Sequence, residues 1–324
     1  MKKIFCFLLV LVLLCLYSCG TKPIDSTDDE SRSVGTLGTH QIAYEELRFI
    51  VNTYIESLKD ANGDSIFDDE SRAETYRKDI EEYFAENIAY NYAILNMCES
   101  SFLDIQNPRI DEAVQREVEK LVESLGGMGK YKKYLRDNYL TDKVYRDNVR
   151  AEILQNELFY VYVDDFGFIE SDTDKIYDII KQDFVRTQHV YVSKSTDGAV
   201  DKINSAYAEI ESGTDFFDIV KKYGEDSSLT EMGEYITRGY MSDEYENAAY
   251  SLDIGQNSGI IESGNGYFIV KRLDIDTLYV MLNLDMLSER YQRYAFLSMI
   301  YEEESKLVFV PNDYMKGLDL LDLK

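Results

Sequence analysis

One strand-forming stretch decides the fold of this chain: Arg186-Thr-Gln-His-Val-Tyr-Val192. It is rich in the β-branched and aromatic residues that favour strands. It also holds His189, one of only two histidines among 324 residues. The residues before it follow helical spacing, whereas the residues after it alternate short helices with strands. The change of period predicts a separate α+β segment set into a mainly helical chain.

The N-terminus has the features of an export signal. Two lysines precede an apolar run, Ile4 to Leu16, which is too short to span a bilayer comfortably as a permanent helix. The run ends in Leu16-Tyr-Ser-Cys19, which resembles the lipobox of bacterial lipoproteins. The resemblance implies that residues 1–19 are a lipoprotein signal peptide with lipid on Cys19, which places the chain on the extracytoplasmic face of a bacterial membrane. The alternative is an ordinary signal peptide that is cut nearby.

Composition limits cross-links, partners and chemistry. Three of the four cysteines fall in the expected signal, so Cys98 alone remains and no intramolecular disulfide can form. The formal net charge of −27 argues against nucleic acid and against an anionic membrane surface as direct ligands. Such a charge favours cationic or unfolded partners. The sequence shows no metal-ligand cluster, phosphate-binding glycine loop or Ser-His-Asp set, so we expect no cofactor.

Helical periodicity dominates most of the remaining chain. Residues 20–33 are polar and are predicted to be a flexible tether. Apolar spacings of three and four then predict helices near 47–58, 76–95, 111–125, 141–158, 174–182 and 282–307. The 27 tyrosines interleave with acids along these helices. They either fill half-buried positions with their hydroxyls in water or form an aromatic surface that contacts polypeptide.

Four motifs follow one another between Gln182 and Asp274. They are a strand with its histidine, Gln188–Val192; a turn and acidic site residue, Gly213–Phe216 and Tyr223–Asp226; a loop and helix, Arg238–Met241 and Tyr245–Tyr250; and a closing hairpin, Gly255–Gly259 and Gly266–Val270. Their order resembles the parvulin (PpiC, rotamase) family of peptidyl-prolyl cis-trans isomerases. The resemblance implies a βα3βαβ2 domain over residues 182–274 and an α+β fold for the chain.

The resemblance also implies a site. Isomerisation needs an apolar slot for the proline ring and polar groups that favour the twisted amide, without a cofactor. Met241 and Tyr245 are implied to line that slot, with Asp226 near the carbonyl and His189 on the strand beneath. The remaining implied substrate-binding residues are Phe268 and Ser263.

This chain departs from the family at two of these positions. A phenylalanine is usual where Tyr245 stands, and a second histidine is usual where Phe268 stands. The paired-histidine arrangement therefore cannot form. His189 is either part of an active isomerase or a structural remnant within the sheet.

The organisation of the whole chain resembles the extracytoplasmic foldases of the PrsA and SurA type. The resemblance implies a helical chaperone domain made of residues 34–181 and 275–324. We expect a membrane-anchored foldase that assists unfolded or partly folded exported polypeptides, with isomerase activity or a degenerate form of it. The alternative is a non-catalytic holdase or assembly scaffold, and a third hypothesis is a structural envelope lipoprotein with one tight partner. A homodimer through the helical domain stays open.

One acidic segment matches part of a calcium-loop pattern. Asp60, Asn62 and Asp64 occupy its first, third and fifth places. The sixth-place glycine and the twelfth-place bidentate glutamate are both missing. The alternative is an acidic connector between two helices.

Overall fold

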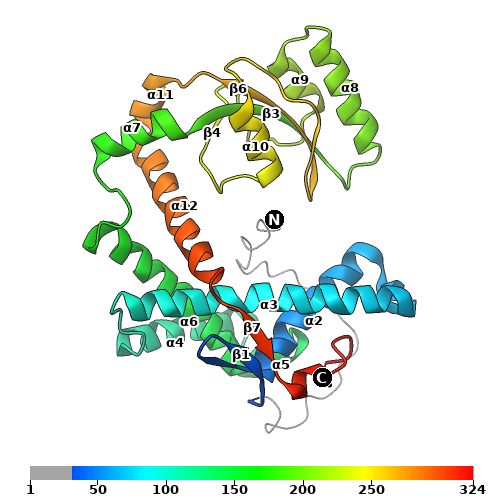
Figure 1. Cartoon of the computed structure of the whole chain (residues 1–324), viewed down its shortest axis with the longest axis vertical. Coiled ribbons are helices and arrows are strands. Elements are labelled where there is room, and N and C mark those ends of the chain that lie inside the picture. Colours follow the sequence, from blue (N-terminus) through cyan, green and yellow to red (C-terminus); the bar gives the residue numbers. More distant parts are fainter. Residues whose placement is uncertain (1–30, 324) are drawn as a thin grey trace. The chain divides into compact units, whose positions relative to one another are not determined.

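The computed structural model describes residues 31–323 (Figure 1). The signal peptide, the lipidation candidate Cys19 and nearly all of the expected tether lie outside the described residues. The described residues form two compact units, one of residues 163–298 and one of residues 31–162 with 299–323. Among these residues, none of the helices combines the length and the apolar character that a membrane crossing requires.

The first and last strands of the described residues meet in a small antiparallel sheet of the unit of residues 31–162 with 299–323, called here the second unit. Its strands are β1 (Ser33–Leu37), β2 (His40–Ala43) and β7 (Phe309–Pro311), in the order β2-β1-β7. Gly35 permits the close approach of β1 and β7, because a Cβ atom there would lie 2.4 Å from the carbonyl oxygen of Val310. None of these three strands was predicted from the sequence.

Helices make up the rest of this unit. Asn107 caps α4, which has Pro108 as its first residue, and Gly126 ends it with a left-handed φ of +85°. The Thr141 hydroxyl accepts a hydrogen bond from the Val144 amide at 3.1 Å and so begins α6. The elements are α2 (Tyr44–Asn62), η1 (Asp64–Phe67), α3 (Glu70–Ser100), α4 (Pro108–Leu125), α5 (Met128–Asp137), α6 (Asp142–Tyr160) and α13 (Asp313–Lys316).

The core of this unit joins segments that are far apart in the sequence. Leu47 and Val51 from α2 pack with Ile80 and Phe84 from α3 and with Met315 near the C-terminus. The ring of Phe84 meets that of Phe309 edge-on, with centroids 5.1 Å apart. The C-terminal residues are therefore part of this core rather than an appended tail.

The cysteine that remains after the expected signal is buried in the last turn of α3. Cys98 has no exposed surface, and burial raises the pKa of its thiol to about 12. The thiolate is the reactive form. We therefore expect the chain from Gly20 onward to resist DTNB in its native state and to react fully once unfolded in urea. A native rate equal to that of free cysteine would contradict this placement.

The other unit is built on an antiparallel sheet with the order β4-β3-β6-β5. A short η2 (Val161–Asp165) precedes it along the chain. Its elements are α7 (Thr173–Asp183), β3 (Val185–Ser193), α8 (Ala199–Glu211), α9 (Phe216–Tyr223), β4 (Glu234–Ile236), α10 (Asp243–Ser251), β5 (Ile261–Glu262), β6 (Gly266–Leu273), α11 (Thr277–Leu282) and α12 (Leu284–Glu304), of which α12 continues into the second unit. The predicted strand at His189 is β3, and the α+β fold class is confirmed.

Strand alternation assigns the helices to opposite faces of this sheet. Val190 and Val192 of β3 pack with α8 and α9, whereas Val185 packs with Tyr245 and Ala249 of α10. Successive strand residues point to opposite faces, so His189 must share the α10 face with Val185. The separate positions of α10 and of α8 with α9 are visible in Figure 1.

This unit extends beyond the segment that carries the four motifs. Ile176 and Ile180 of α7 form one buried cluster with Tyr235 of β4, Val280 of α11 and Leu287 of α12. The boundaries expected at 181/182 and 274/275 therefore fall inside a compact unit. The physical reason is that the apolar faces of α7 and α12 are buried against β4, a contact that local periodicity does not show.

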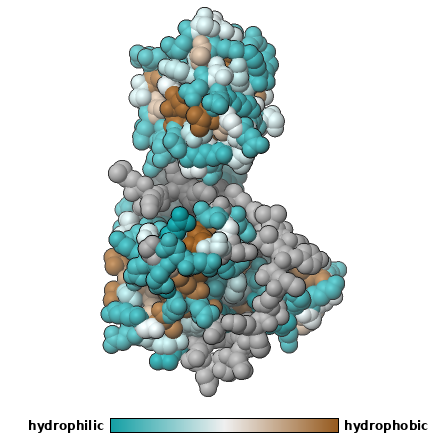
Figure 2. Space-filling view, turned by 90° about the vertical axis from the view of Figure 1, so that its right-hand side faces the viewer, coloured by the Kyte–Doolittle hydropathy of each residue, from teal (hydrophilic) through white to brown (hydrophobic). Residues whose placement is uncertain are grey.

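Polar residues dominate the visible surface. Figure 2 shows a mainly hydrophilic face on which apolar residues gather in small patches. This agrees with the strong net negative charge, which keeps a chain soluble.

Candidate functional site

His189 is the centre of a buried hydrogen-bonded cluster on the α10 face of the sheet. Its side chain is 2% exposed. Its Nε2 lies 3.2 Å from Oδ2 of Asp226, and its Nδ1 lies 3.1 Å from the hydroxyl of Tyr245. Both ring nitrogens therefore have a partner, as a buried imidazole requires.

Asp226 reaches this cluster from the loop that follows α9. The loop is anchored beside β3, because the Glu225 amide donates to the Tyr191 carbonyl at 2.9 Å and the Glu225 carboxylate accepts from the Ser193 amide at 2.8 Å. Asp226 accepts two further hydrogen bonds, from the amide and the hydroxyl of Ser228 at 2.9 and 2.6 Å. The bond from His189, helped by those from Ser228, holds the pKa of Asp226 well below its usual range.

Tyr245 is a buried member of the cluster around His189. Only 1% of its surface is exposed. Its hydroxyl lies 2.9 Å from the Thr187 hydroxyl as well as beside His189. Burial raises the pKa of Tyr245, which keeps the phenol neutral at physiological pH. Tyr245, which was expected to supply an apolar surface, thus also supplies a hydroxyl group to the cluster.

The apolar part of the site consists of Phe268, Met241 and Tyr191, which are all half-buried. The Phe268 ring stands nearly perpendicular to His189 and to Tyr245, with centroids 5.5 and 5.3 Å away. Met241 and Phe268 pack against the same cluster as Tyr245. The loop before α10 is held by the buried Glu246 carboxylate, which accepts from the Met241 amide at 2.9 Å.

The structure brings together five of the six side chains expected in the site. His189, Asp226, Met241, Tyr245 and Phe268 all lie on the α10 face. The sixth, Ser263, lies in the turn between β5 and β6, where its hydroxyl donates to the Gly266 carbonyl at 3.0 Å.

Two further residues of the site were not predicted from the sequence, although the spacing of each along the chain indicates its role. Thr187 precedes His189 by two residues on a strand and therefore shares its face. Ser228 follows Asp226 by two residues, the usual spacing at which an aspartate side chain bonds a later backbone amide.

The acidic segment expected as a calcium loop or a connector is mostly helical. Asp60 and Asn62 lie in the last turn of α2, and Asp64 begins η1. The side-chain amide of Asn62 donates to the Leu58 carbonyl at 2.9 Å. Within residues 31–323, no group of three or more histidine, cysteine or acidic side chains is arranged to hold a metal ion.

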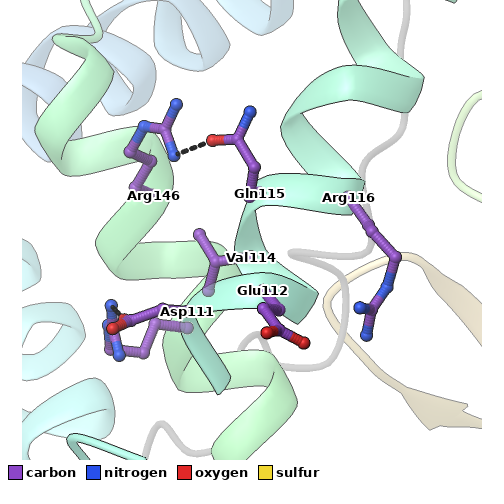
Figure 3. A pocket seen from close by; sticks show the side chains of 7 residues that line it. Asp111, Glu112, Val114, Gln115, Arg116 and Arg146 are labelled. Carbon is purple, nitrogen blue, oxygen red and sulfur yellow. Dashed lines mark hydrogen bonds and ion pairs between the residues drawn. The ribbon is translucent and has the colours of Figure 1, made fainter. Parts of the chain in front are cut away.

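A groove of about 610 Å³ lies between α4 and α6 in the second unit (Figure 3). Arg146 donates to the Gln115 side chain at 2.9 Å, and Arg150 forms an ion pair with Asp111. Val114 contributes apolar surface. The groove offers paired charges but no nucleophile or histidine, so it does not compete with the His189 cluster as a reactive site.

Asp226 should also leave a mark on acid stability. Its pKa is lowered on folding, so its contribution is complete above the ordinary value of 3.8 and is lost as the pH falls through the lower folded value. We expect the free energy of unfolding to fall more steeply below about pH 4 in the wild type than in Asp226→Asn. Urea denaturation of both proteins from pH 6 to pH 3 measures this. Parallel curves would contradict the ionised, hydrogen-bonded carboxylate.

The fold and this cluster define a class of domain. Residues 184–274 match the family model described as "Rotamase", a PPIC-type PPIASE domain. The chain therefore carries a parvulin-type domain, as the order of its motifs indicated.

Several named proteins are similar to longer parts of the chain. The chain is 26% identical over 207 residues to foldase protein PrsA 2 of Bacillus cereus, which covers 60% of this chain and 67% of the relative. It is 30% identical over 176 residues to foldase protein PrsA of Staphylococcus aureus, across 50% of this chain and 52% of the relative. The crystal structure of PrsA from Bacillus anthracis is 21% identical, covers 66% of this chain and 94% of its own, and superposes with a TM-score of 0.35.

Proposed function

We propose that this chain is an extracytoplasmic foldase that accelerates X-Pro isomerisation in exported polypeptides. In this proposal lipid on Cys19 anchors it to a bacterial membrane, and the unit of residues 31–162 with 299–323 binds unfolded clients. The observation that carries the proposal is the ionised Asp226 hydrogen-bonded to His189 beside the apolar surface of Met241 and Phe268.

The geometry suggests how these residues lower the barrier. A planar amide carries partial negative charge on its oxygen through resonance, and rotation about the C–N bond costs about 18–20 kcal/mol because that resonance is lost. A carboxylate beside this oxygen destabilises the planar form more than the twisted form. Asp226 stays ionised because its pKa is lowered, so it provides this charge without a cofactor.

The apolar side chains have a separate task. Met241 and Phe268 hold the proline ring while the carbonyl side of the bond rotates. Positioning of this kind reduces the entropy that the reaction must lose. His189 orients Asp226 and takes no proton from the substrate, since isomerisation transfers none.

The experiment is a protease-coupled isomerase assay on a series of X-Pro tetrapeptides. We expect acceleration by the wild-type chain and a loss of about tenfold with Met241→Ala, because the slot loses its flexible apolar side. Met232→Ala is the matched control: Met232 is 40% exposed, and only its backbone carbonyl makes a hydrogen bond, accepting from Arg186 at 2.6 Å. Equal losses from both variants would contradict the assignment of the slot.

The second candidate function is that of a non-catalytic holdase or assembly scaffold. The presence of Phe268 where the family has a second histidine favours it. This function predicts no acceleration by a folded wild-type chain, together with suppressed aggregation of an unfolded client. Mass spectrometry of the mature N-terminus tests the anchor independently, because Cys19→Ser must abolish the lipid mass.

A further inference from the structure

The Tyr245 hydroxyl has a position that the proposed function does not yet use. It lies 3.1 Å from His189 Nδ1 and 2.9 Å from the Thr187 hydroxyl. All three side chains are almost fully buried, with exposures of 1%, 2% and 0% for Tyr245, His189 and Thr187. Water therefore has little access to these polar atoms, and each must be satisfied by the others.

The direction of each hydrogen bond follows from counting donors. An ionised carboxylate only accepts, so Nε2 of His189 must donate to Asp226. When the ring carries a single proton, that proton is on Nε2 and Nδ1 is left as an acceptor. The Tyr245 hydroxyl must then donate to Nδ1 and accept from Thr187. The result is one directed chain from Thr187 through Tyr245 and His189 to Asp226.

Among the described residues, the side chains around His189 offer Nδ1 no hydrogen-bond partner other than the Tyr245 hydroxyl. Phe268 meets the rings of His189 and Tyr245 edge-on and offers no donor or acceptor. Val270, the neighbour of His189 across the strands, is apolar and fully buried. The tyrosine hydroxyl is the group that occupies the place next to Nδ1.

We infer that Tyr245 is a positioning residue whose hydroxyl orients His189, so that the Nε2–H of that ring points at Asp226. The family's second histidine would stand at position 268, where this chain has Phe268, which cannot make a hydrogen bond. In this chain the Tyr245 hydroxyl makes that hydrogen bond instead. The inference deepens the proposed function and rests on it for its effect on catalysis. The direction of the hydrogen bonds is a property of the folded chain and can be measured without any activity.

The first test is spectroscopic and uses the full chain labelled with [15N]histidine. The chain contains only His40 and His189, so a His40→Gln variant assigns the ring signals. At pH 7 we expect His189 to show a protonated Nε2 and a bare, hydrogen-bonded Nδ1. A ring protonated on both nitrogens, or on Nδ1 alone, would overturn the inference.

Variants then test the role of the hydroxyl. Tyr245→Phe removes one oxygen and keeps the packed ring, so we expect a shifted and broadened Nδ1 signal of His189. Thr187→Val should leave that signal nearly unchanged, because Tyr245 donates to His189 and not to Thr187. Tyr250→Phe is the matched control on the same helix, since it removes a hydroxyl that donates to the Asp183 carbonyl at 2.8 Å. A His189 spectrum that responds equally to Tyr245→Phe and to Tyr250→Phe overturns the inference.

Kinetics provide the last readout. With Tyr245→Phe we expect about a tenfold lower kcat and an unchanged KM, because the apolar slot persists while Asp226 loses its oriented partner. An unchanged kcat in an active enzyme would overturn the positioning role. A wild-type chain without isomerase activity would instead overturn the proposed function, and the ring-nitrogen spectra would then decide the inference by themselves.

Discussion

Replacing Asp226 with asparagine is expected to lower kcat for X-Pro peptides by about 10- to 100-fold. The substitution keeps the shape of the side chain and removes the charge that destabilises the planar amide. Single charged or hydrogen-bonding groups aimed at a transition state contribute losses of this order or larger when they are removed. The protease-coupled assay on the tetrapeptide series measures the change.

The control for this prediction is Asp253→Asn. Asp253 is also an aspartate of the parvulin-type unit, but it is exposed and lies in the loop after α10. We expect its replacement to leave kcat unchanged. If Asp226→Asn retained full activity in a folded protein, the charge would have no part in catalysis and the holdase function would be favoured.

Replacing Phe84 with alanine is expected to destabilise the second unit by about 3–5 kcal/mol. The side chain is fully buried in the cluster that joins α2, α3 and the C-terminal residues. Its loss opens a cavity and removes the edge-on contact with Phe309. Urea denaturation followed by tyrosine fluorescence measures the free energy of unfolding.

The matched variant is Phe102→Ala. Phe102 is 93% exposed in the turn after α3, so its truncation removes almost no buried surface. We expect a change within about 0.5 kcal/mol. Similar losses from both variants would mean that Phe84 does not lie in a packed core.

Much of the parvulin-type unit could be predicted from short-range patterns. Residues 187–193 form a strand because β-branched and aromatic residues are concentrated there, and the observed β3 covers Val185–Ser193. In the other unit, the predicted helix limits near residues 125 and 141 agree with the observed ends, where Gly126 ends α4 and Thr141 caps α6. The segment from Asp60 to Asp64 was harder, because its acidic residues fit a loop and a helix end equally well.

Longer-range pairings could not be predicted. The strand at Ser33 pairs with the one at Phe309, across almost the whole chain, and each strand is too short to show a period of its own. The packing partners of α7 and α12 could not be predicted for a similar reason. The apolar faces of α7 and α12 were recognised, but periodicity does not say which surface covers them.

The sequence by itself determined the parvulin-type domain, because its motifs follow one another with fixed local spacing. It also determined that the site lacks the second histidine that is usual in the family, since Phe268 stands at that position. Only the tertiary structure decided what Tyr245 does. A hydroxyl's partner depends on which strand residue the helix packs against, and the packing of α10 on β3 brings it within hydrogen-bond distance of Thr187 and His189.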